Sequence, residues 1–547
     1  MTTQYAIQIT AKDTVGVNPA MPVPEIGPSQ ILLKVQACGI CFSDTKLMHA
    51  FESHPRKSPI LSGIDLEKLA AIPTYRPGSD PVVPGHEPVA VVAAVGESVT
   101  RFHVGQRVLV QTDYRHLPTA SANGAFGYDF DGALEEYALV DEAMVIDPIS
   151  GESYLIDVGD EPAASAVALV EPWACVETAY AWSERQHVKK GGSLLVVVDE
   201  GVEPLGLEDL VVAGEPSRFI RVGQAAGLEK AQERSLGELD GTFDDIVYIG
   251  ADPETVETLS PFLGNRGLMA IVTCGRTFSR EVSLDPGRVH YDLIRYAGTT
   301  SSNVLEAYSW IPATCDLRVG DKVGVIGAAG PMGLMHAVRT ATAGVENVTL
   351  DAIDVDDDRL SRLHAVLEPI AAKAGTPTRI VNSRVTPLEP GVYTYVALMV
   401  PAPALLKQSV EVAGRDSIVN AFAGFAIGTM SPLDLNKIVG EHVYLVGTSG
   451  SRIVDMVTVL RRLEAGTVDT NISLDAVTGM AGVVDAIESV NNRTSQGKIM
   501  VYPYLHNLGL TRLVEMPEKM PKVAAALKDG LWTKAAEEAL IAEETKE

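Results

Sequence analysis

The pattern of apolar and polar residues begins with short β-branched runs separated by Gly, Pro and Asp. Four such runs lie in the first 150 residues, at 31–39, 88–96, 107–112 and 134–140. Short β-branched segments between turn-forming residues are typical of strands. The pattern therefore predicts a β-rich N-terminal domain, which we place at residues 1–185.

After Glu171 the pattern changes to unbroken apolar strands that alternate with helical segments. The strand candidates are 194–198, 244–251, 268–275, 322–330 and 348–354. Strands that are apolar on both faces and are followed by helices indicate a parallel sheet covered on both sides. The predicted fold class is therefore α/β, with doubly wound parallel sheets of the Rossmann type behind the β-rich domain.

The α/β region repeats itself. Leu284–Ser302 aligns without gaps to Leu433–Ser451 at an offset of 149, with five of 19 positions identical, among them Gly298 and Gly447. A strand followed by Gly precedes each copy, and a repeated unit indicates duplicated architecture. We predict two tandem Rossmann-like units at 186–310 and 311–460, and a segment at 461–547 that returns to the first domain and ends in a helical tail.

Composition narrows the possible partners. The net charge is −27 and the isoelectric point is near 4.8, whereas nucleic acids and anionic membranes attract basic surfaces. No apolar run approaches the roughly 20 residues of a membrane span, and the N-terminus lacks a signal-peptide pattern. Five cysteines in 547 residues form no disulfide framework. We expect a cytoplasmic protein that binds a small-molecule substrate, and neither nucleic acid nor membrane.

One glycine-rich turn predicts dinucleotide binding. It follows a predicted strand, opens a helix and consists of small residues that let a pyrophosphate approach the backbone. The cofactor-binding candidates in it are Gly327, Ala329, Gly330, Pro331, Met332 and Gly333. Asp354 ends the next strand, 21 residues after Gly333, where a carboxylate accepts the ribose hydroxyls of NAD and repels the 2′-phosphate of NADP. Arg359 is placed to contact the adenosine ribose or phosphates.

The equivalent turn of the first Rossmann-like unit differs. Its strand runs into Asp199, Glu200 and Glu203, and its glycine spacing is wrong for a phosphate. We predict that this copy binds no cofactor, has become structural or reshapes the substrate cleft, and leaves one NAD per chain.

A possible metal site lies ahead of these sheets. Cys41, His86 and Glu171 offer a thiolate, an imidazole and a carboxylate, which suit a Zn²⁺ ion with one position left open for substrate. The alternatives are a buried cysteine, a structural histidine, or a redox pair made by Cys38 and Cys41.

Several motifs together resemble those of the zinc-dependent medium-chain alcohol and polyol dehydrogenase family. They are GICFSD at 39–44, GHE at 85–87, residues 96–108, GAAGPMG at 327–333 and GTSGS at 447–451, in the family's order. Glu171-Pro172 resembles its sorbitol, threonine and sorbose-phosphate branch. The resemblance implies a GroES-like catalytic domain at the N-terminus.

The resemblance also implies roles for single residues. The ligands of one catalytic zinc would be Cys41, His86 and Glu171, with Glu87 as a neighbouring or alternate ligand and Cys175 as a rival. Ser43 matches the hydroxyl that relays the substrate proton, and Asp44 matches the carboxylate that orients the ligand histidine.

Four departures from the family are visible, and one is the extra Rossmann-like unit at 186–310, which has no counterpart in the ordinary family. Residues 90–150 contain no cysteine, so no structural zinc is expected. The usual relay histidine is Lys46 here, with His49 as a possible substitute. An insertion at about 50–80 is either a solvated loop or a phosphate handle at the substrate entrance; its cations are Arg56, Lys57, Lys68 and Arg76.

The expected activity is hydride transfer between NAD and a polyhydroxylated alcohol or ketone, such as a sugar, sugar alcohol, cyclitol or a phosphate ester of these. Asp129 and Asp131 would suit such a substrate, or are simply turn residues. The alternatives are a lyase or epimerase that uses tightly bound NAD for transient oxidation, and a non-catalytic sensor or scaffold. Family habit suggests a homo-oligomer.

Overall fold

The computed structural model describes residues 2–545 and divides the chain into two compact units. Unit 1 comprises Met1–Glu177 and Gly450–Glu547, and unit 2 comprises Thr178–Ser449. The chain thus leaves unit 1 within helix α5 (Val170–Ala181) and returns before α14 (Ile453–Glu464), which packs against α4 (Ala164–Ala168). Among the described residues, no helix is long and apolar enough to cross a membrane.

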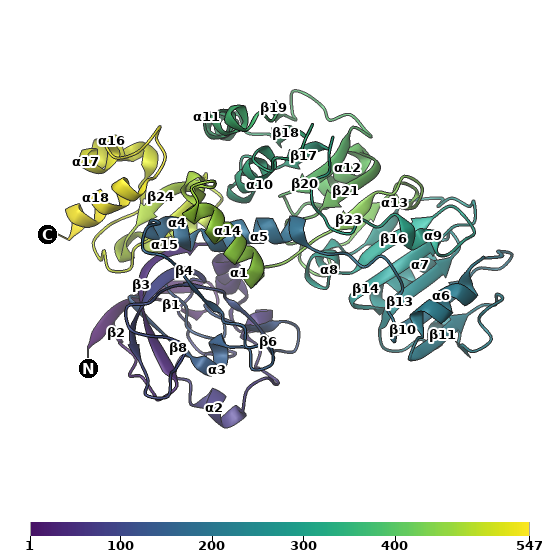
Figure 1. Cartoon of the computed structure of the whole chain (residues 1–547), viewed down its shortest axis with the longest axis horizontal. Coiled ribbons are helices and arrows are strands. Elements are labelled where there is room, and N and C mark those ends of the chain that lie inside the picture. The colour runs from purple at the N-terminus through teal and green to yellow at the C-terminus, as the bar shows by residue number, and fades with distance from the viewer. Residues whose placement is uncertain (1, 546–547) are drawn as a thin grey trace. The chain divides into compact units, whose positions relative to one another are not determined.

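Unit 1 is built on an eight-stranded sheet in the order β26-β24-β25-β3-β4-β5-β9, with β8 also paired to β3 (Figure 1). Its strands are β3 (Gln30–Ile40), β4 (Glu87–Val95), β5 (Arg107–Val110), β8 (Tyr137–Asp141), β9 (Leu155–Asp157), β24 (Leu474–Thr478), β25 (Lys498–Val501) and β26 (Thr511–Arg512). Two hairpins stand beside it, β1 (Thr3–Ala11) with β2 (Thr14–Pro22) and β6 (Asp113–Pro118) with β7 (Asn123–Ala125).

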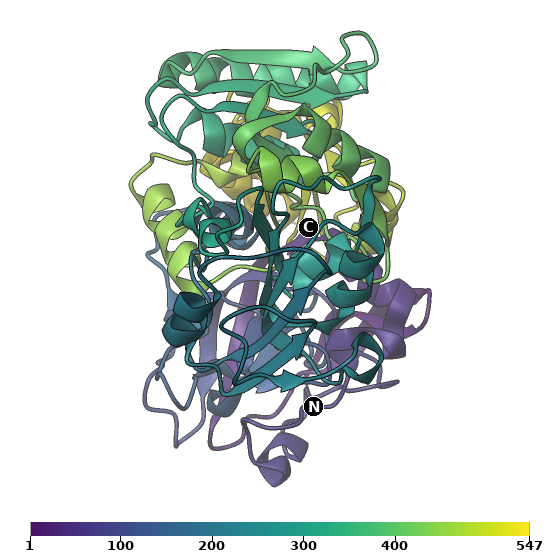
Figure 2. The same ribbon diagram turned by 90° about the vertical axis from the view of Figure 1, so that its right-hand side faces the viewer.

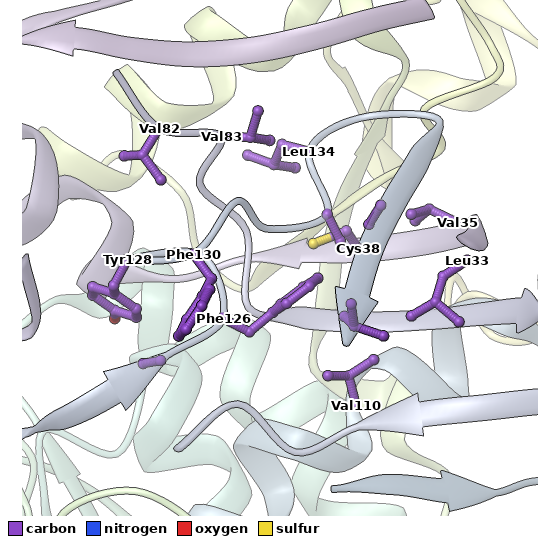
Figure 3. Packing of buried hydrophobic residues seen from close by; sticks show 14 of the residues in the cluster. Leu33, Val35, Cys38, Val82, Val83, Val110, Phe126, Tyr128, Phe130 and Leu134 are labelled. Atoms are coloured by element: carbon purple, nitrogen blue, oxygen red, sulfur yellow. The ribbon is translucent and has the colours of Figure 1, made fainter. Parts of the chain in front are cut away.

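Alternation along β3 places its apolar side chains in the core of unit 1. Leu33, Val35 and Cys38 are buried, while Lys34 between them is exposed. Figure 3 shows these residues packed with Val110, Phe126 and Phe130 of the same cluster. The C-terminal segment completes this sheet, because β25 runs antiparallel to β3.

The other helices of unit 1 are mostly short. They are α1 (Phe42–Ala50), α2 (Leu66–Ala70), α3 (Glu142–Val145), α15 (Val483–Asn491), α16 (Met516–Lys519), α17 (Pro521–Ala524) and α18 (Lys534–Glu544). The tail is tied down through Glu537 of α18, whose carboxylate accepts hydrogen bonds from the backbone N–H groups of Ala164 and Ser165 at the start of α4. A carboxylate at a helix N-terminus is favoured by the helix dipole.

Unit 2 contains two six-stranded parallel sheets with the same strand order (Figures 1 and 2). The first, β12-β11-β10-β13-β14-β16, is formed by β10 (Ser193–Val198), β11 (Arg218–Val222), β12 (Gln232–Glu233), β13 (Phe243–Ile249), β14 (Leu263–Val272) and β16 (Arg295–Thr299). The second, β19-β18-β17-β20-β21-β23, is formed by β17 (Lys322–Ile326), β18 (Thr349–Asp354), β19 (Thr378–Asn382), β20 (Tyr393–Leu398), β21 (Ala413–Asn420) and β23 (Tyr444–Val446). Both follow the order 3-2-1-4-5-6 of the Rossmann fold, which confirms the predicted fold class.

The two copies differ in their helices. The second has α10 (Pro331–Ala341), α11 (Asp357–Ala374), α12 (Pro403–Val412) and α13 (Leu435–Gly440), and the first has α6 (Leu207–Gly214), α7 (Pro253–Leu259), α8 (Pro286–Tyr291) and α9 (Glu306–Ser309). In the second copy the long α11 connects β18 to β19, whereas residues 223–231 connect β11 to β12 without a helix. The first copy therefore has no helix at the position that corresponds to α11.

A small antiparallel pair joins the copies: β15 (Val282–Leu284) pairs with β22 (Ser431–Leu433). Val282 lies opposite Leu433, and Leu284 lies opposite Ser431. The repeat offset of 149 relates Val282 to Ser431 and Leu284 to Leu433, so Val282 faces the equivalent of Leu284, and Leu284 faces the equivalent of Val282. This reciprocity is the mark of a local two-fold axis.

Candidate metal centre and dinucleotide loop

Cys41 occupies the junction between β3 and α1. It is the residue before the helix and has an extended backbone, with φ −114°. Its backbone N–H donates to Oδ2 of Asp44 at 2.8 Å, which fixes the first turn of α1. This local geometry holds Cys41 at the end of a central strand.

Asp44 joins this turn to the loop that carries His86. Its Oδ1 lies 3.1 Å from Nδ1 of His86 and accepts the N–H of Gly85 at 3.3 Å. Burial opposes ionisation, but the charge and hydrogen bond of His86 and the N–H of Cys41 hold the pKa of Asp44 below its ordinary value. The carboxylate orients the imidazole, with its Nε2 left for another partner.

Glu87 begins β4 directly after His86 and lies against Gly39 of β3. A Cβ on Gly39 would come within 2.2 Å of Glu87 Oε2, so the carboxylate needs a glycine here. Oε1 of Glu87 accepts a hydrogen bond from Nζ of Lys498 at 2.6 Å. Oε2 is buried and has no hydrogen-bond partner among residues 2–545. A buried oxygen without a partner is costly, and a cation would satisfy it.

Cys41, His86 and Glu87 bring three potential ligand atoms within 4.8 Å of one another. This set of one sulfur, one nitrogen and one oxygen donor fits a catalytic Zn²⁺ site. A carboxylate that bonds to the second ring nitrogen of the histidine is also typical of such sites. The orphaned oxygen of Glu87 supports this fit independently of the residue types.

Glu171 lies outside that group but beside it. It stands in the first turn of α5, and its Oε1 accepts hydrogen bonds from Ser451 Oγ at 3.1 Å and from Cys175 Sγ at 3.4 Å. Burial first, and then the charge of Glu87, raise the pKa of Glu171. The structure thus brings Glu87 to Cys41 and His86, and the role of Glu171 or Cys175 as a ligand stays a prediction.

The remaining residues of the predicted relay and redox pair take different positions. The hydroxyl of Ser43 lies 3.6 Å from Cys41 Sγ. The ring nitrogens of His49 are bonded instead to Asp13 at 2.5 Å and to Asn491 at 2.8 Å. Cys38 is buried in the hydrophobic core (Figure 3). Ser43 therefore places a hydroxyl beside Cys41, whereas His49 is engaged elsewhere.

Asp129 and Asp131, predicted as substrate neighbours or turn residues, are buried and bonded within the protein. Asp129 Oδ1 accepts the N–H of Ala125 at 2.6 Å, and Asp131 accepts the N–H of Val83 at 2.9 Å. Both bonds hold loop backbone in place, which is the turn role. Tyr128, next to Asp129 in the sequence, packs beside the cluster, with its ring centroid 5.4 Å from that of His86.

The glycine-rich turn of the second Rossmann-like copy connects β17 to α10. Gly327 has φ +85°, a conformation that side chains rarely adopt. A Cβ on Gly333 would lie 2.1 Å from the carbonyl oxygen of Gly327, so the helix packs directly on the turn. This is the arrangement in which a helix N-terminus can receive a pyrophosphate.

Asp354 lies at the end of β18 next to this turn. Its Oδ2 accepts the N–H of Ala329 at 3.0 Å, and its Oδ1 accepts that of Val355 at 2.8 Å. Arg359 lies in the first turn of α11, with its N–H bonded to Asp356 at 2.9 Å. The strand, the glycine-rich turn and the acidic residue thus follow one another in the predicted order. Direct contact with a cofactor stays a prediction for Asp354, Arg359, Pro331 and Met332.

In the first copy a carboxylate fills the corresponding place. Asp199 directly follows β10, and its Oδ2 accepts a hydrogen bond from the Tyr248 hydroxyl at 2.8 Å. A Cβ on Gly250 would lie 2.0 Å from the same oxygen. An anion held at this strand end repels phosphate.

Lys498 is the site residue that sequence reasoning missed. Its Nζ donates to Glu87 and to the carbonyl oxygen of Ile40 at 2.8 Å, and it is buried. Burial alone would lower the pKa of Lys498, but the charge of Glu87 raises it. The pairing of β25 with β3 brings Lys498 to Glu87, and no local sequence motif predicts this pairing.

The chain is similar to known dehydrogenases. Residues 27–149 match the alcohol dehydrogenase GroES-like domain. D-altritol 5-dehydrogenase of Agrobacterium fabrum is 29% identical over 182 residues, 31% of this chain and 44% of that relative. Mannitol-1-phosphate 5-dehydrogenase of Aliivibrio fischeri is 26% identical over 246 residues, 41% of this chain and 57% of that relative. The chain thus spans about half the length of these two relatives.

The fold comparison covers more of the chain. The crystal structure of 2R,3R-butanediol dehydrogenase from Bacillus subtilis superposes with a TM-score of 0.52 and 16% identity, over 92% of this chain and 100% of that structure. The GroES-like match, the similarity to polyol dehydrogenases and the shared fold agree with the motifs around Cys41, His86 and Gly327. Residues 27–149 thus match an alcohol dehydrogenase GroES-like domain, and the chain shares its overall fold with 2R,3R-butanediol dehydrogenase.

Proposed function

We propose that the protein is a zinc-dependent oxidoreductase that transfers a hydride between NAD and a polyhydroxylated alcohol or the corresponding ketone. The observation that carries the proposal is the convergence of Cys41, His86 and Glu87, with their ligand atoms within 4.8 Å of one another. When bound, Zn²⁺ would supply Lewis acidity that lowers the pKa of a substrate hydroxyl, and NAD would supply the hydride acceptor.

The residues of the chain divide the remaining work. Cys41, His86 and Glu87 or Glu171 would hold the metal, and Asp44 keeps His86 in position through its 3.1 Å contact. Ser43, partly exposed beside Cys41, takes the substrate proton and passes it to water. Two similar proteins act on altritol and on mannitol 1-phosphate, which supports a polyol as the substrate class.

One catalytic zinc and one NAD per chain complete the proposal. The acids at the first copy's turn, led by Asp199, support a single dinucleotide site in the second copy. Asp354 supports NAD over NADP, because a carboxylate at the end of β18 would repel a 2′-phosphate. Asp354→Ser should lower the preference for NAD over NADP by roughly tenfold or more, and Asp358→Ser, an exposed neighbour, should leave it unchanged.

Metal analysis combined with an NAD-coupled screen of polyols, ketoses and their phosphates tests the proposal. The expected result is one zinc per chain and NADH formation with at least one polyol. Cys41→Ser should lose zinc and activity, whereas Cys274→Ser in unit 2 should keep both. Zinc and activity that survive in Cys41→Ser would refute the metal assignment, and NAD that stays bound without net NADH formation would indicate transient oxidation instead.

A further inference from the structure

Arg56 stands apart from the other cations of the 50–80 insertion. Lys57 is buried and donates its Nζ to backbone carbonyl groups. Arg76 bonds to Asp131 at 3.1 Å, and Lys68 lies on the exposed side of α2. These three cations hold the fold or face solvent, whereas Arg56 lies against Tyr128, whose ring packs beside His86.

The guanidinium of Arg56 keeps its hydrogen-bond donors available. Its Nη1 lies 3.4 Å from Oδ1 of Asp113, too far for a strong hydrogen bond, and its Cζ lies 5.4 Å from the centroid of the Tyr128 ring. Within residues 2–545, no acceptor takes a hydrogen bond from this guanidinium, and the side chain is 23% exposed. A guanidinium has five N–H donors in a planar fork, so most of its capacity is unused.

Tyr128 connects Arg56 to the cluster. The guanidinium of Arg56 lies over the Tyr128 ring, and the centroid of this ring lies 5.4 Å from that of His86. The Tyr128 side chain is buried, yet its hydroxyl has no hydrogen-bond partner in the part of the chain that the structure describes. The phenol of Tyr128 thus stands beside His86, a predicted metal ligand, and the guanidinium of Arg56 stands beside the same phenol ring.

The local charge balance favours an anion. Asp113 is shared by two guanidinium groups, because Arg115 Nε lies 3.4 Å from its Oδ2 while Arg56 lies near its Oδ1. Arg115 is held in place by a 2.7 Å hydrogen bond to the carbonyl oxygen of Ser451. Burial raises the pKa of the neighbouring Asp129 to about 8, so that carboxyl is mostly neutral at physiological pH. Arg56 and Arg115 therefore share the carboxylate of Asp113, and Glu171 is a further acidic group whose charge acts on Arg56.

We propose that Arg56 and Tyr128 form an anion-binding subsite beside Cys41, His86 and Glu87, and that it takes the phosphate of a phosphorylated polyol. A guanidinium fork matches two phosphate oxygens, and the phenol can donate to the third. The subsite rests on the proposed function, which it deepens by naming the substrate class. Since the two reported relatives act on a neutral and on a phosphorylated polyol, sequence similarity alone does not choose between them.

The test compares matched substrates in the zinc-loaded protein. The kcat/KM ratio for hexitol 1-phosphates over the corresponding free hexitols is measured, with aldonates as carboxylate probes. Arg56→Gln should lower the phosphate-to-neutral ratio by roughly ten- to a hundredfold, and Arg56→Lys by less, because it keeps the charge without the fork. Lys68→Gln, a cation of the same insertion, should leave the ratio unchanged. An unchanged ratio in Arg56→Gln, or a larger loss with aldonates than with phosphates, would overturn the assignment.

Direct binding separates the subsite from the activity. Binding of inorganic phosphate and of hexitol 1-phosphate is measured by calorimetry in the wild-type protein, Arg56→Gln and Lys68→Gln, with thermal unfolding as the control for folding. Asp113 keeps Arg115 as a partner in Arg56→Gln, so the variant should fold. Binding that is lost in Arg56→Gln without polyol oxidation by any protein would support the subsite and refute the proposed function. If the protein oxidises free hexitols but Arg56→Gln leaves phosphate binding unaltered, the proposed function is supported and the subsite is refuted.

Discussion

Gly298 and Gly447 lie 149 residues apart, and each packs against a helix of the other Rossmann-like copy. A Cβ on Gly298 would stand 2.8 Å from Cγ2 of Val439 in α13, and one on Gly447 would stand 3.0 Å from Cα of His290 in α8. Val439 and His290 are also 149 residues apart. The contact is therefore reciprocal, as in a symmetric dimer, and the first copy acts as a partner of the second within one chain. The expected homo-oligomer stays a prediction and would need another surface.

This close approach predicts that Gly298→Ala destabilises unit 2. The added methyl group would meet the carbonyl oxygen of Ile271 at 2.4 Å as well as Val439, and overpacking of a core costs about 1–3 kcal/mol. Thermal unfolding of the full chain should show a lower Tm. Gly237→Ala is the control, since a Cβ there meets nothing within 4 Å. Equal stability of the two variants would show that the copies do not pack tightly at Gly298.

Asp44→Asn should weaken zinc binding while leaving the ligands in place. Asp44 is the group that accepts from Nδ1 of His86, and losing such a carboxylate lowers metal affinity by about 10- to 100-fold. Competition with a chelator of known affinity measures the change. Asp13→Asn removes the other aspartate–histidine pair of unit 1, at exposed His49, and should leave zinc affinity as it is. An equal effect of both variants would count against an orienting role for Asp44.

Local patterns predict what local interactions determine. Apolar periodicity predicts the parallel strands, and the weak 149-residue repeat predicts the two copies, because each follows from contiguous residues. The closeness of Glu87 to Cys41 depends on the register of β3 and β4, which places Gly39 opposite Glu87. The contribution of Lys498 depends on the pairing of β25 with β3, which brings Lys498 to Glu87, 411 residues earlier in the chain. No single motif determines the register between distant strands. The positions of Glu87 and Lys498 at the cluster could therefore not be predicted from the sequence alone.

Asp129 predicts a pH-dependent loss of stability. Burial raises the pKa of Asp129 from 3.8 to about 8, against the opposing charges of Arg56 and Lys57. Between these two values the native state binds more protons than the unfolded state, so its stability falls as the pH rises. Asp129→Asn keeps the acceptor for Ala125 but cannot ionise, and should become more stable relative to the wild-type protein from pH 4 to 8.

Denaturant unfolding at several pH values measures the effect of Asp129→Asn. The expected difference from the wild-type protein grows by on the order of 1 kcal/mol per pH unit across that window. Glu52→Gln, which removes an exposed carboxylate of unit 1, should show no such slope. A constant difference for Asp129→Asn would mean that this carboxyl ionises normally in the folded protein.

Lys498→Met should be strongly destabilising without zinc and largely rescued by it. The pair with Glu87 is buried, at 5% and 0% side-chain exposure, so removing Lys498 leaves a carboxylate without a cation, at a cost of about 3–5 kcal/mol. Zinc bound to Glu87 would restore a positive partner, and a ligand that binds only the native state raises its stability. Thermal unfolding with and without zinc should therefore show a larger zinc-induced rise in Tm for Lys498→Met than for the wild-type protein. Lys519→Met removes the exposed pair with Glu515 and should cost less than about 1 kcal/mol. If Lys498→Met behaves like Lys519→Met, Glu87 is not held as a charged group at this centre.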